Sequence, residues 1–344
     1  MTMNVLICDD SGFARKQMAR ALPPDWPVTV HFAEHGVAGV EQALMGHGEV
    51  IFLDLTMPEL DGYGVLETLK REGIKSKVIV VSGDIQPEAH QKVMSLGAID
   101  FIKKPATAEQ IAALLRHHGL WQPGGQAPAP ILTQPTESSA ENTGSGLLLG
   151  SETRDAYQEI ANVAMGQAAD LLARLLDAFV VLPIPNVNVL EVSELHMALN
   201  AAADQDTLSA VCQGFIGAGI AGEALLLFHD SSFNDLARLM KMEGPLDRSA
   251  ELELLMDTAN VLIGAFLRGY AEQLDTPFSQ GHPVILGQHR PIKELIHTNQ
   301  SRWRRTLAIE INYRVEGYAV QCDLLLLFTE DSITTMNNKI MHML

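Results

Sequence analysis

Five short apolar runs alternate with five amphipathic segments over the first 121 residues, and this alternation constrains the fold more than any other feature of the chain. The apolar runs are nearly continuous, as expected for strands that are buried on both faces. Strands alternating with helices form a parallel sheet covered on both sides. The sequence therefore predicts a doubly wound α/β fold with a five-stranded parallel sheet. The expected strands cover 4–8, 28–33, 50–54, 77–82 and 99–102, and the expected helices cover 12–22, 36–46, 62–72, 88–96 and 107–118.

The composition changes after residue 121. Residues 122–149 are rich in Pro, Gly, Ser and Thr and contain no aromatic side chain. Such a segment cannot bury enough apolar surface to offset its chain entropy, which predicts a flexible linker. A flexible chain of about 28 residues has a root-mean-square span of about 30 Å, so the flanking domains can meet. We therefore expect a first domain at 1–121, a linker at 122–149 and a second domain at 150–344.

The charge balance of the chain limits its partners. The sequence has 42 Asp and Glu against 24 Lys and Arg, a formal net charge of −18. A phosphate backbone would be repelled, so we expect no nucleic-acid partner. The sequence contains no apolar stretch of membrane-spanning length, and its first ten residues turn acidic too early for a signal peptide. We therefore expect a cytoplasmic protein without membrane insertion.

Acidic, hydroxyl and cationic residues stand at the ends of the expected strands. The carboxyl ends of parallel strands meet at one edge of a sheet, so these side chains should converge. Three carboxylates in one place repel each other unless a cation is bound, and oxygen ligands suit Mg²⁺. A hydroxyl and an ammonium beside them suit phosphoryl transfer onto a carboxylate, with Asp54 as the nucleophile. The residues are Asp9, Asp10, Asp54, Ser82 and Lys104.

Residues 1–121 resemble a response-regulator receiver domain of the CheY type. The resemblance is carried by Asp9-Asp10, by the run from Asp54 to Gly62, by Ser82-Gly83 and by Lys104-Pro105. It covers the whole of the expected first domain.

This resemblance implies that a histidine kinase donates a phosphoryl group to Asp54. It implies Mg²⁺ bound by Asp10 and Asp54, by Asp9 through water, and by the backbone carbonyl of Thr56. Phe101 stands where the family has its switch aromatic, and it lacks the hydroxyl of a tyrosine.

An internal repeat spans the second domain. Ala-Asn-Val around Asn162 recurs around Asn260, 98 positions later, and Pro185 and Pro283 each follow their Asn by 23 positions. We therefore predict two similar halves related by a pseudo-twofold axis.

Each half should open with a long amphipathic helix and continue into β-rich segments. The apolar runs that end at Phe228 and Phe328 resemble each other, which extends the repeat into those segments. Together they predict an antiparallel sheet carrying two helices, an α+β layer. The β-rich segments are 187–195, 214–229, 307–313 and 317–328.

An acid and an amide recur on both expected helices. Spacings of i, i+4 and i+7 place the three polar residues of each copy on one outward helix face. Such a face is typically just solvated. Alternatively, the Asn holds a water in line while the acid orients a cation of a partner. The residues are Asp155, Glu159 and Asn162 in the first copy and Glu253, Asp257 and Asn260 in the second.

A glycine lies one turn beyond each Asn, at Gly166 and Gly264. Glycine inside a helix costs roughly 0.5–1 kcal/mol relative to alanine. Two explanations remain open: close approach of another backbone beside the Asn, or tight helix packing within the domain.

Residues 150–344 resemble the CheC/CheX/FliY phosphatase family, whose motif reads Asp/Ser-x3-Glu-x2-Asn-x22-Pro. Asp155, Glu159, Asn162 and Pro185 satisfy every position. The resemblance implies that Asn162 positions the attacking water and that Glu159 engages the lysine of a phosphorylated receiver. We expect Pro185 to end the helix, because its ring removes a helical donor.

The second copy departs from this motif. Asp257 replaces Glu and is one methylene shorter, and Glu253 stands where Asp or Ser is expected, whereas Asn260 and Pro283 are kept. Whether the second pair, Asp257 and Asn260, is active stays open.

The leading hypothesis is an aspartyl-phosphate phosphatase fused to its own receiver. Its substrate would be a phosphorylated CheY-like receiver, either a separate protein or the attached one. One alternative is a non-enzymatic module whose binding to a partner is controlled by phosphorylation of Asp54. Another is a phosphate sink, in which only the turnover of the receiver matters.

Overall fold

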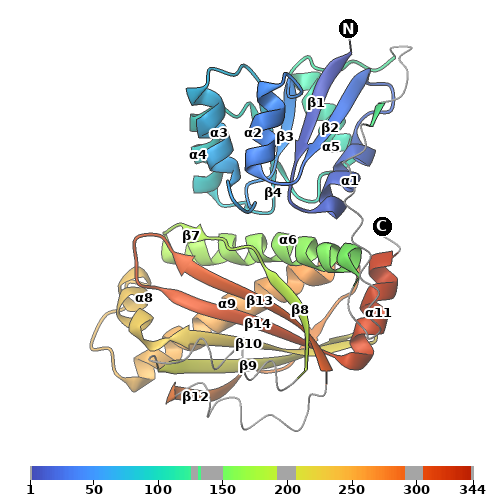
Figure 1. The fold of residues 1–344 in the computed structure, drawn as a ribbon. Coiled ribbons are helices and arrows are strands. Elements are labelled where there is room, and N and C mark those ends of the chain that lie inside the picture. The colour runs from blue at the N-terminus through green and yellow to red at the C-terminus, as the bar shows by residue number, and fades with distance from the viewer. Residues whose placement is uncertain (1, 125–130, 133–149, 192–206, 291–304, 342–344) are drawn as a thin grey trace. The chain divides into compact units, whose positions relative to one another are not determined.

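The computed structural model describes residues 2–124, 131–132, 150–191, 207–290 and 305–341 (Figure 1). The chain divides into two compact units, Met1–Leu148 and Leu149–Leu344. Among the described residues, no helix is long and apolar enough to cross a membrane.

The first unit is a parallel sheet with strand order β5-β4-β3-β1-β2-β6. The predicted five-stranded parallel sheet is confirmed, and a short sixth strand is added at its edge, where it pairs with Thr29 and Val30 of β2. That strand lies within the segment predicted as linker, most of which falls outside the described residues. The strands are β1 (Met3–Cys8), β2 (Val28–Ala33), β3 (Val50–Leu53), β4 (Lys77–Ser82), β5 (Asp100–Lys103) and β6 (Ile131–Leu132).

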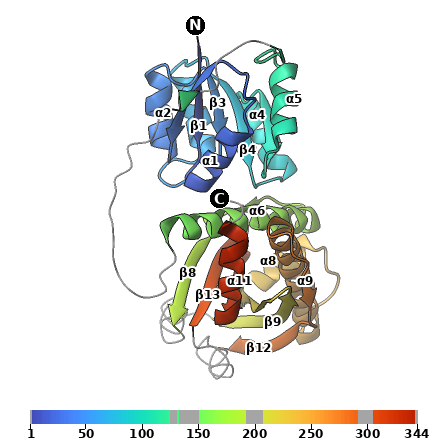
Figure 2. The same ribbon diagram turned by 90° about the vertical axis from the view of Figure 1, so that its right-hand side faces the viewer.

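Helices cover both faces of this sheet (Figures 1 and 2). Side chains of β1 alternate between the faces, with Val5 and Ile7 in one apolar cluster and Leu6 and Cys8 in the other. Helices α1 and α5 contribute to the first cluster, and α2, α3 and α4 to the second. The helices are α1 (Gly12–Ala21), α2 (Gly36–Leu44), α3 (Gly62–Arg71), α4 (Pro87–Leu96) and α5 (Ala108–His117).

Side-chain caps start four of these helices, α1, α2, α3 and α5. The Ser11 hydroxyl accepts a hydrogen bond from Ala14 N (3.0 Å) at α1, and Asp61 accepts one from Gly64 N (2.7 Å) at α3. Thr107 forms a capping box with Gln110 at α5. Because such caps satisfy amides that have no partner inside the helix, they fix where each loop ends.

The second unit is an antiparallel sheet with helices on one of its faces (Figure 1). Its main path runs β11-β9-β10-β14-β13-β7, with β12 also paired to β9 and β8 to β13. The strands are β7 (Val180–Val181), β8 (Asn186–Glu191), β9 (Leu208–Gly217), β10 (Ile220–His229), β11 (Ser279–Gln280), β12 (Val284–Arg290), β13 (Arg305–Val315) and β14 (Gln321–Thr329). The helices are α6 (Ser151–Leu176), α8 (Phe233–Leu239), α9 (Arg248–Gln273) and α11 (Glu330–Met341), with a 3₁₀ turn η1 (Asp230–Ser232).

The two halves of this unit repeat the same order of elements. Among the described residues of each half, a helix of 26 residues, α6 or α9, leads into four strands and a closing helix. Strands β10 and β14, one from each half, pair in the middle of the sheet. The sequence repeat therefore corresponds to a structural duplication within one continuous sheet.

Both long helices pack on the sheet through equivalent apolar stripes. Every residue of the two stripes is at most 1% exposed, so this face of each helix belongs to the core. The stripes are Tyr157, Ala161, Ala164, Ala168 and Leu172 in α6 and Leu255, Ala259, Leu262, Phe266 and Tyr270 in α9.

The prediction that Pro185 ends the first long helix is wrong. Helix α6 ends at Leu176, where Asp177 adopts a left-handed conformation with φ of 52°. Pro185 instead precedes β8 directly, and Pro283 precedes β12 in the same way. Proline is tolerated next to the start of a strand because no ladder hydrogen bond is required from its nitrogen there.

Candidate functional site

Three carboxylates converge at the carboxyl edge of the first sheet. Asp9 and Asp10 directly follow β1, and Asp54 directly follows β3, which is paired with β1. One oxygen from each lies within 4.8 Å of the others. The parallel pairing of β1 and β3 thus produces the acidic cluster that the sequence predicts.

Lys104 and Ser82 complete this pocket. The Lys104 ammonium lies 2.7 Å from Asp9 Oδ2 and 3.2 Å from Asp54 Oδ1, and the lysine is 4% exposed. The Ser82 hydroxyl is fully buried at the end of β4 and accepts a hydrogen bond from Asp84 N (3.1 Å). All five residues that the sequence places at the strand ends are therefore brought together.

Asp54 is the most deeply buried of the acids, with 1% exposure. Burial raises its pKa to about 7; Lys104 opposes the rise, and Asp9 and Asp10 add to it. The Thr56 amide donates to Asp54 Oδ2 (3.0 Å), and the buried Asp54 Oδ1 faces the Lys104 ammonium at 3.2 Å. A buried carboxylate held this way is only partly neutralised by the protein itself.

These residues fit a divalent cation. Hard ions such as Mg²⁺ prefer several oxygen ligands, and the cluster offers oxygens from three carboxylates. Asp9, Asp10 and Asp54 are the side chains that would hold the ion. That the backbone carbonyl of Thr56 also binds the ion stays a prediction.

Phe101 lies on β5, half-buried against the cluster formed by α2, α3 and α4. The ring of His90, an exposed residue of α4, contacts it edge-on, with 5.5 Å between centroids and 71° between planes. His90 is a neighbour of the predicted switch position that the sequence analysis did not find, because no motif includes it.

The polar stripes of the second unit lie away from its sheet. Helical geometry places Asn162 and Glu159 about 100–160° around α6 from the core residue Ala161. Asp257 and Asn260, at the same places on α9, are exposed, as predicted. Glu159 and Asn162, however, are only 7% and 6% exposed, so the expectation of an exposed face is wrong for the first pair.

The sequence left two explanations open for Gly166 and Gly264: close approach of another backbone, or tight helix packing within the unit. A Cβ added at Gly264 would meet no atom within 4 Å, so packing within the unit does not require this glycine. Gly269, which the sequence analysis missed, is the close contact between the helices. A Cβ there would lie 3.0 Å from the Ala164 Cα and 2.8 Å from Gln167 Oε1.

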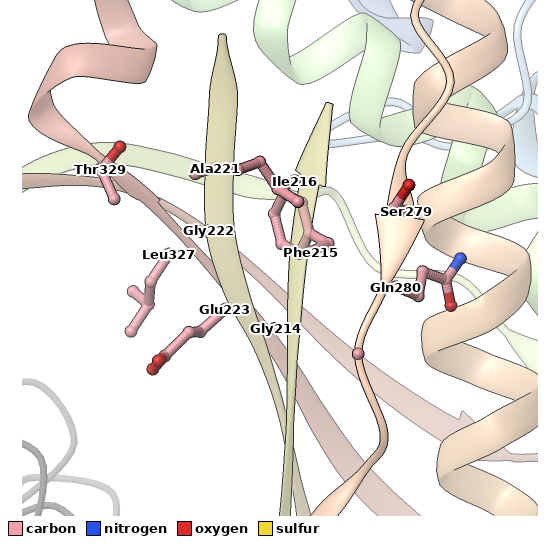
Figure 3. Close-up of a pocket in the computed structure, with 11 residues that line it drawn as sticks. Gly214, Phe215, Ile216, Ala221, Gly222, Glu223, Ser279, Gln280, Leu327 and Thr329 are labelled. Atoms are coloured by element: carbon pink, nitrogen blue, oxygen red, sulfur yellow. The ribbon is translucent and has the colours of Figure 1, made fainter. Parts of the chain in front are cut away.

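A groove of about 600 Å³ lies over β9, β10 and β11 (Figure 3). It is lined largely by backbone and apolar groups, including Gly214, Ile216 and Leu327, with Ser279 and Gln280 on one side. Neither acid–amide pair lines it.

Comparison with known proteins assigns the first unit. The family model described as response regulator receiver domain matches residues 5–116. The chemotaxis protein CheY of Treponema pallidum is 33% identical over 118 residues, which cover 82% of that protein and 33% of this chain. This chain belongs to the response-regulator family. Its first unit is a receiver domain, and the acidic cluster is the pocket of that receiver.

Other proteins match only part of this chain. A protein-glutamate methylesterase/protein-glutamine glutaminase of Symbiobacterium thermophilum is 37% identical over 107 residues, which span 29% of that protein and 30% of this chain. The crystal structure of Thermotoga maritima FliY is matched over its whole length and 58% of this chain, with 17% identity and a TM-score of 0.43.

Proposed function

We propose that the protein is a response regulator phosphorylated on Asp54 whose second unit hydrolyses the aspartyl phosphate of a CheY-like receiver, either a separate protein or its own. A histidine kinase is the phosphoryl donor, and Mg²⁺ in the Asp9, Asp10 and Asp54 cluster supports the transfer. Lys104 and Ser82 stand beside Asp54, where the oxygens of a transferred phosphoryl group would lie.

One observation carries the phosphatase proposal. The same acid–amide pair occurs on equivalent turns of two equivalent helices, on faces that do not pack on the sheet. Neither pair belongs to the apolar core stripes; Asp257 and Asn260 are exposed, whereas Glu159 and Asn162 are buried. The open space at Gly264, one turn beyond Asn260, leaves room for another backbone to approach the second pair.

The chemistry needs no covalent intermediate on the second unit. The amide of Asn162 accepts from and orients a water that attacks phosphorus in line, and the Asp54-type carboxylate leaves. Water and acyl phosphate thereby become free carboxylate and inorganic phosphate. Glu159 forms an ion pair with the receiver lysine and holds the two proteins in register. A positioned water that accelerates hydrolysis a hundred- to a thousandfold lowers the barrier by about 2.7–4 kcal/mol, within the range of orientation effects.

The test follows release of inorganic phosphate from a separate phosphorylated CheY-like receiver on addition of the full-length protein carrying Asp54→Asn. This background cannot accept the phosphoryl group itself. We expect acceleration by this protein and about a hundredfold loss of it in the Asn162→Ala, Asn260→Ala double variant. Each single variant then assigns the activity to one pair.

The rival functions give different outcomes. A binding module predicts that neither Asn substitution changes dephosphorylation, whereas Asp54→Asn abolishes partner binding. A phosphate sink predicts that removal of residues 122–344 leaves the decay of phospho-Asp54 unchanged. Equal phosphate release with and without both Asn side chains, measured both on a separate phosphorylated receiver and on phospho-Asp54 of this protein, would end the phosphatase proposal.

A further inference from the structure

Four polar side chains from four elements meet at one end of the second sheet. His289 of β12 places Nδ1 2.9 Å from Asp230 Oδ2 of η1 and Nε2 2.9 Å from Glu251 Oε2 in the first turn of α9. The Ser209 hydroxyl of β9 donates to the other Asp230 oxygen (2.7 Å). We call Ser209, Asp230, Glu251 and His289 the β12 cluster.

The β12 cluster requires a protonated histidine to be satisfied. Both ring nitrogens face carboxylate oxygens, which only accept hydrogen bonds, and only the imidazolium carries two N–H groups. A neutral ring would turn one lone pair towards a carboxylate. Asp230 and Glu251 are the acids that face His289 among the described residues. The nearby cation Arg248 donates to Gln288 Oε1 (3.0 Å).

The arrangement does not fit a catalytic or metal site. The Ser209 hydroxyl donates to Asp230, and both nitrogens of His289 are engaged by acids, so no base activates the serine. The two carboxylates lie on opposite sides of the imidazole and do not converge with it on one point.

Strand β12 is paired irregularly. Among the described residues its only strand partner is β9, and its register shifts twice, between Ile285 and Gly287 and between Gly287 and Arg290. Val284 and Ile285 are 58% and 40% exposed, and His289 itself has a left-handed φ of 51°. The β12 cluster therefore holds the end of a strand whose ladder is irregular.

The first half of the unit provides an internal comparison. Its corresponding strand, β8, pairs with β13 over six consecutive positions without interruption. The residue 98 positions before His289 is Glu191, so that half has no equivalent histidine. The duplicated fold thus does not require the β12 cluster, which is confined to the half with the irregular strand.

We propose that His289 is a pH-operated latch that, when protonated, fastens β12 to η1 and α9 and, when neutral, releases β12 from the edge of β9. Hydrogen bonding to Asp230 is the main cause that raises the pKa of His289, with Glu251 adding to it and partial burial opposing it. Because the pKa of His289 is raised in the folded protein, the ion pairs of the protonated ring stabilise the fold fully below the ordinary histidine pKa. This stabilisation is lost as pH rises through the raised pKa. Release leaves the backbone of β9 from Leu208 to Cys212 without its outer partner.

Hydrogen–deuterium exchange of the full-length protein between pH 5.5 and 8.5, corrected for intrinsic rates, tests the latch. We expect protection of residues 284–290 and 208–212 to fall about two- to fivefold with rising pH, the scale of partly exposed ion pairs, while β8 and β13 stay constant. His289→Gln should show the low protection at every pH. His282→Gln, an exposed histidine outside the cluster, should keep the wild-type profile.

Hydrogen–deuterium exchange does not depend on phosphatase activity, so a failure of the latch can be distinguished from a failure of the proposed function. A flat corrected profile for β12 in the wild-type protein, or an unchanged profile in His289→Gln, overturns the proposal. A shift of the midpoint to lower pH in Glu251→Gln, which removes one acceptor charge, further supports it.

Discussion

Leu225 of β10 and Leu325 of β14 pair directly with each other at the centre of the second sheet. They are equivalent residues of the two halves, since each lies three positions before the phenylalanine that ends its apolar run. A residue can pair with its own counterpart only on a twofold axis. The neighbouring pairs agree, because Gly222 pairs with Phe328 while Phe228 pairs with Cys322. Differences between the halves are therefore not imposed by the fold.

The two glycines of α9 should respond in opposite directions to alanine. Gly264→Ala adds a methyl group in open space and should stabilise the second unit by about 0.5–1 kcal/mol, since helical glycine is entropically costly. Gly269→Ala pushes a methyl group against the Ala164 backbone and should destabilise it by about 1–3 kcal/mol. Calorimetry of the full-length protein should show the second unit's transition moving up in one variant and down in the other.

Each glycine variant is the control for the other, because both make the same substitution in the same helix. The receiver transition should not move in either. A destabilised Gly264→Ala protein would show that this glycine packs within the unit, which was the second explanation left open by the sequence.

The receiver pocket could be predicted from the sequence because the carboxyl ends of parallel strands lie at one edge of the sheet, regardless of the conformation of the loops. Continuous apolar runs located the strands, and Asp9, Asp54 and Ser82 followed at their ends. The distances were not predictable, because the 2.7 Å contact between Lys104 and Asp9 depends on how two loops pack.

The second unit was harder to predict because its contacts link distant segments. The β12 cluster joins residues as far apart as Ser209 and His289, and no local pattern signals that meeting. Gly269 is important through its close contact with Ala164 and Gln167 of another helix. Pro185 was misinterpreted as a helix end because proline excludes helix interiors and also suits the start of a strand.

Mg²⁺ should stabilise the receiver, because it binds the folded acidic cluster and not the unfolded chain. At a hundredfold excess over its dissociation constant it should contribute about 2.7 kcal/mol. Calorimetry with Mg²⁺ and with a chelator should show the receiver transition rising in the wild-type protein and not in Asp10→Asn. Glu67→Gln, which removes an exposed acid of α3 outside the cluster, should respond as the wild type does. An equal response in Asp10→Asn would exclude Asp10 as a ligand.

Lys104→Met should destabilise the receiver strongly when Mg²⁺ is absent. The lysine is the buried cation between Asp9 and Asp54, and removing one partner of a buried ion pair costs about 3–5 kcal/mol. Added Mg²⁺ should recover part of this loss, because a second cation then occupies the acidic cluster. Thermal unfolding of the full-length variant with and without Mg²⁺ measures both effects. A variant that is as stable as the wild type in chelator would show that the charge repulsion among the three acids is relieved in another way, such as by protonation.

Lengthening Asp257 should strengthen the second acid–amide pair if this pair acts on receivers. Asp257 is exposed on α9 one turn before Asn260, but its carboxylate is one methylene nearer the helix than Glu159 on α6. Displacements near 1 Å change rates by up to about a hundredfold, so Asp257→Glu in an Asn162→Ala background should raise phosphate release from a separate receiver by about tenfold. Asp257→Asn, which keeps the length and removes the charge, should reduce release to the level of the Asn162→Ala, Asn260→Ala double variant. If Asp257→Glu and Asp257→Asn behave alike, the acid of the second pair takes no part in engaging the receiver, and the departure of this copy from the motif marks a lost site.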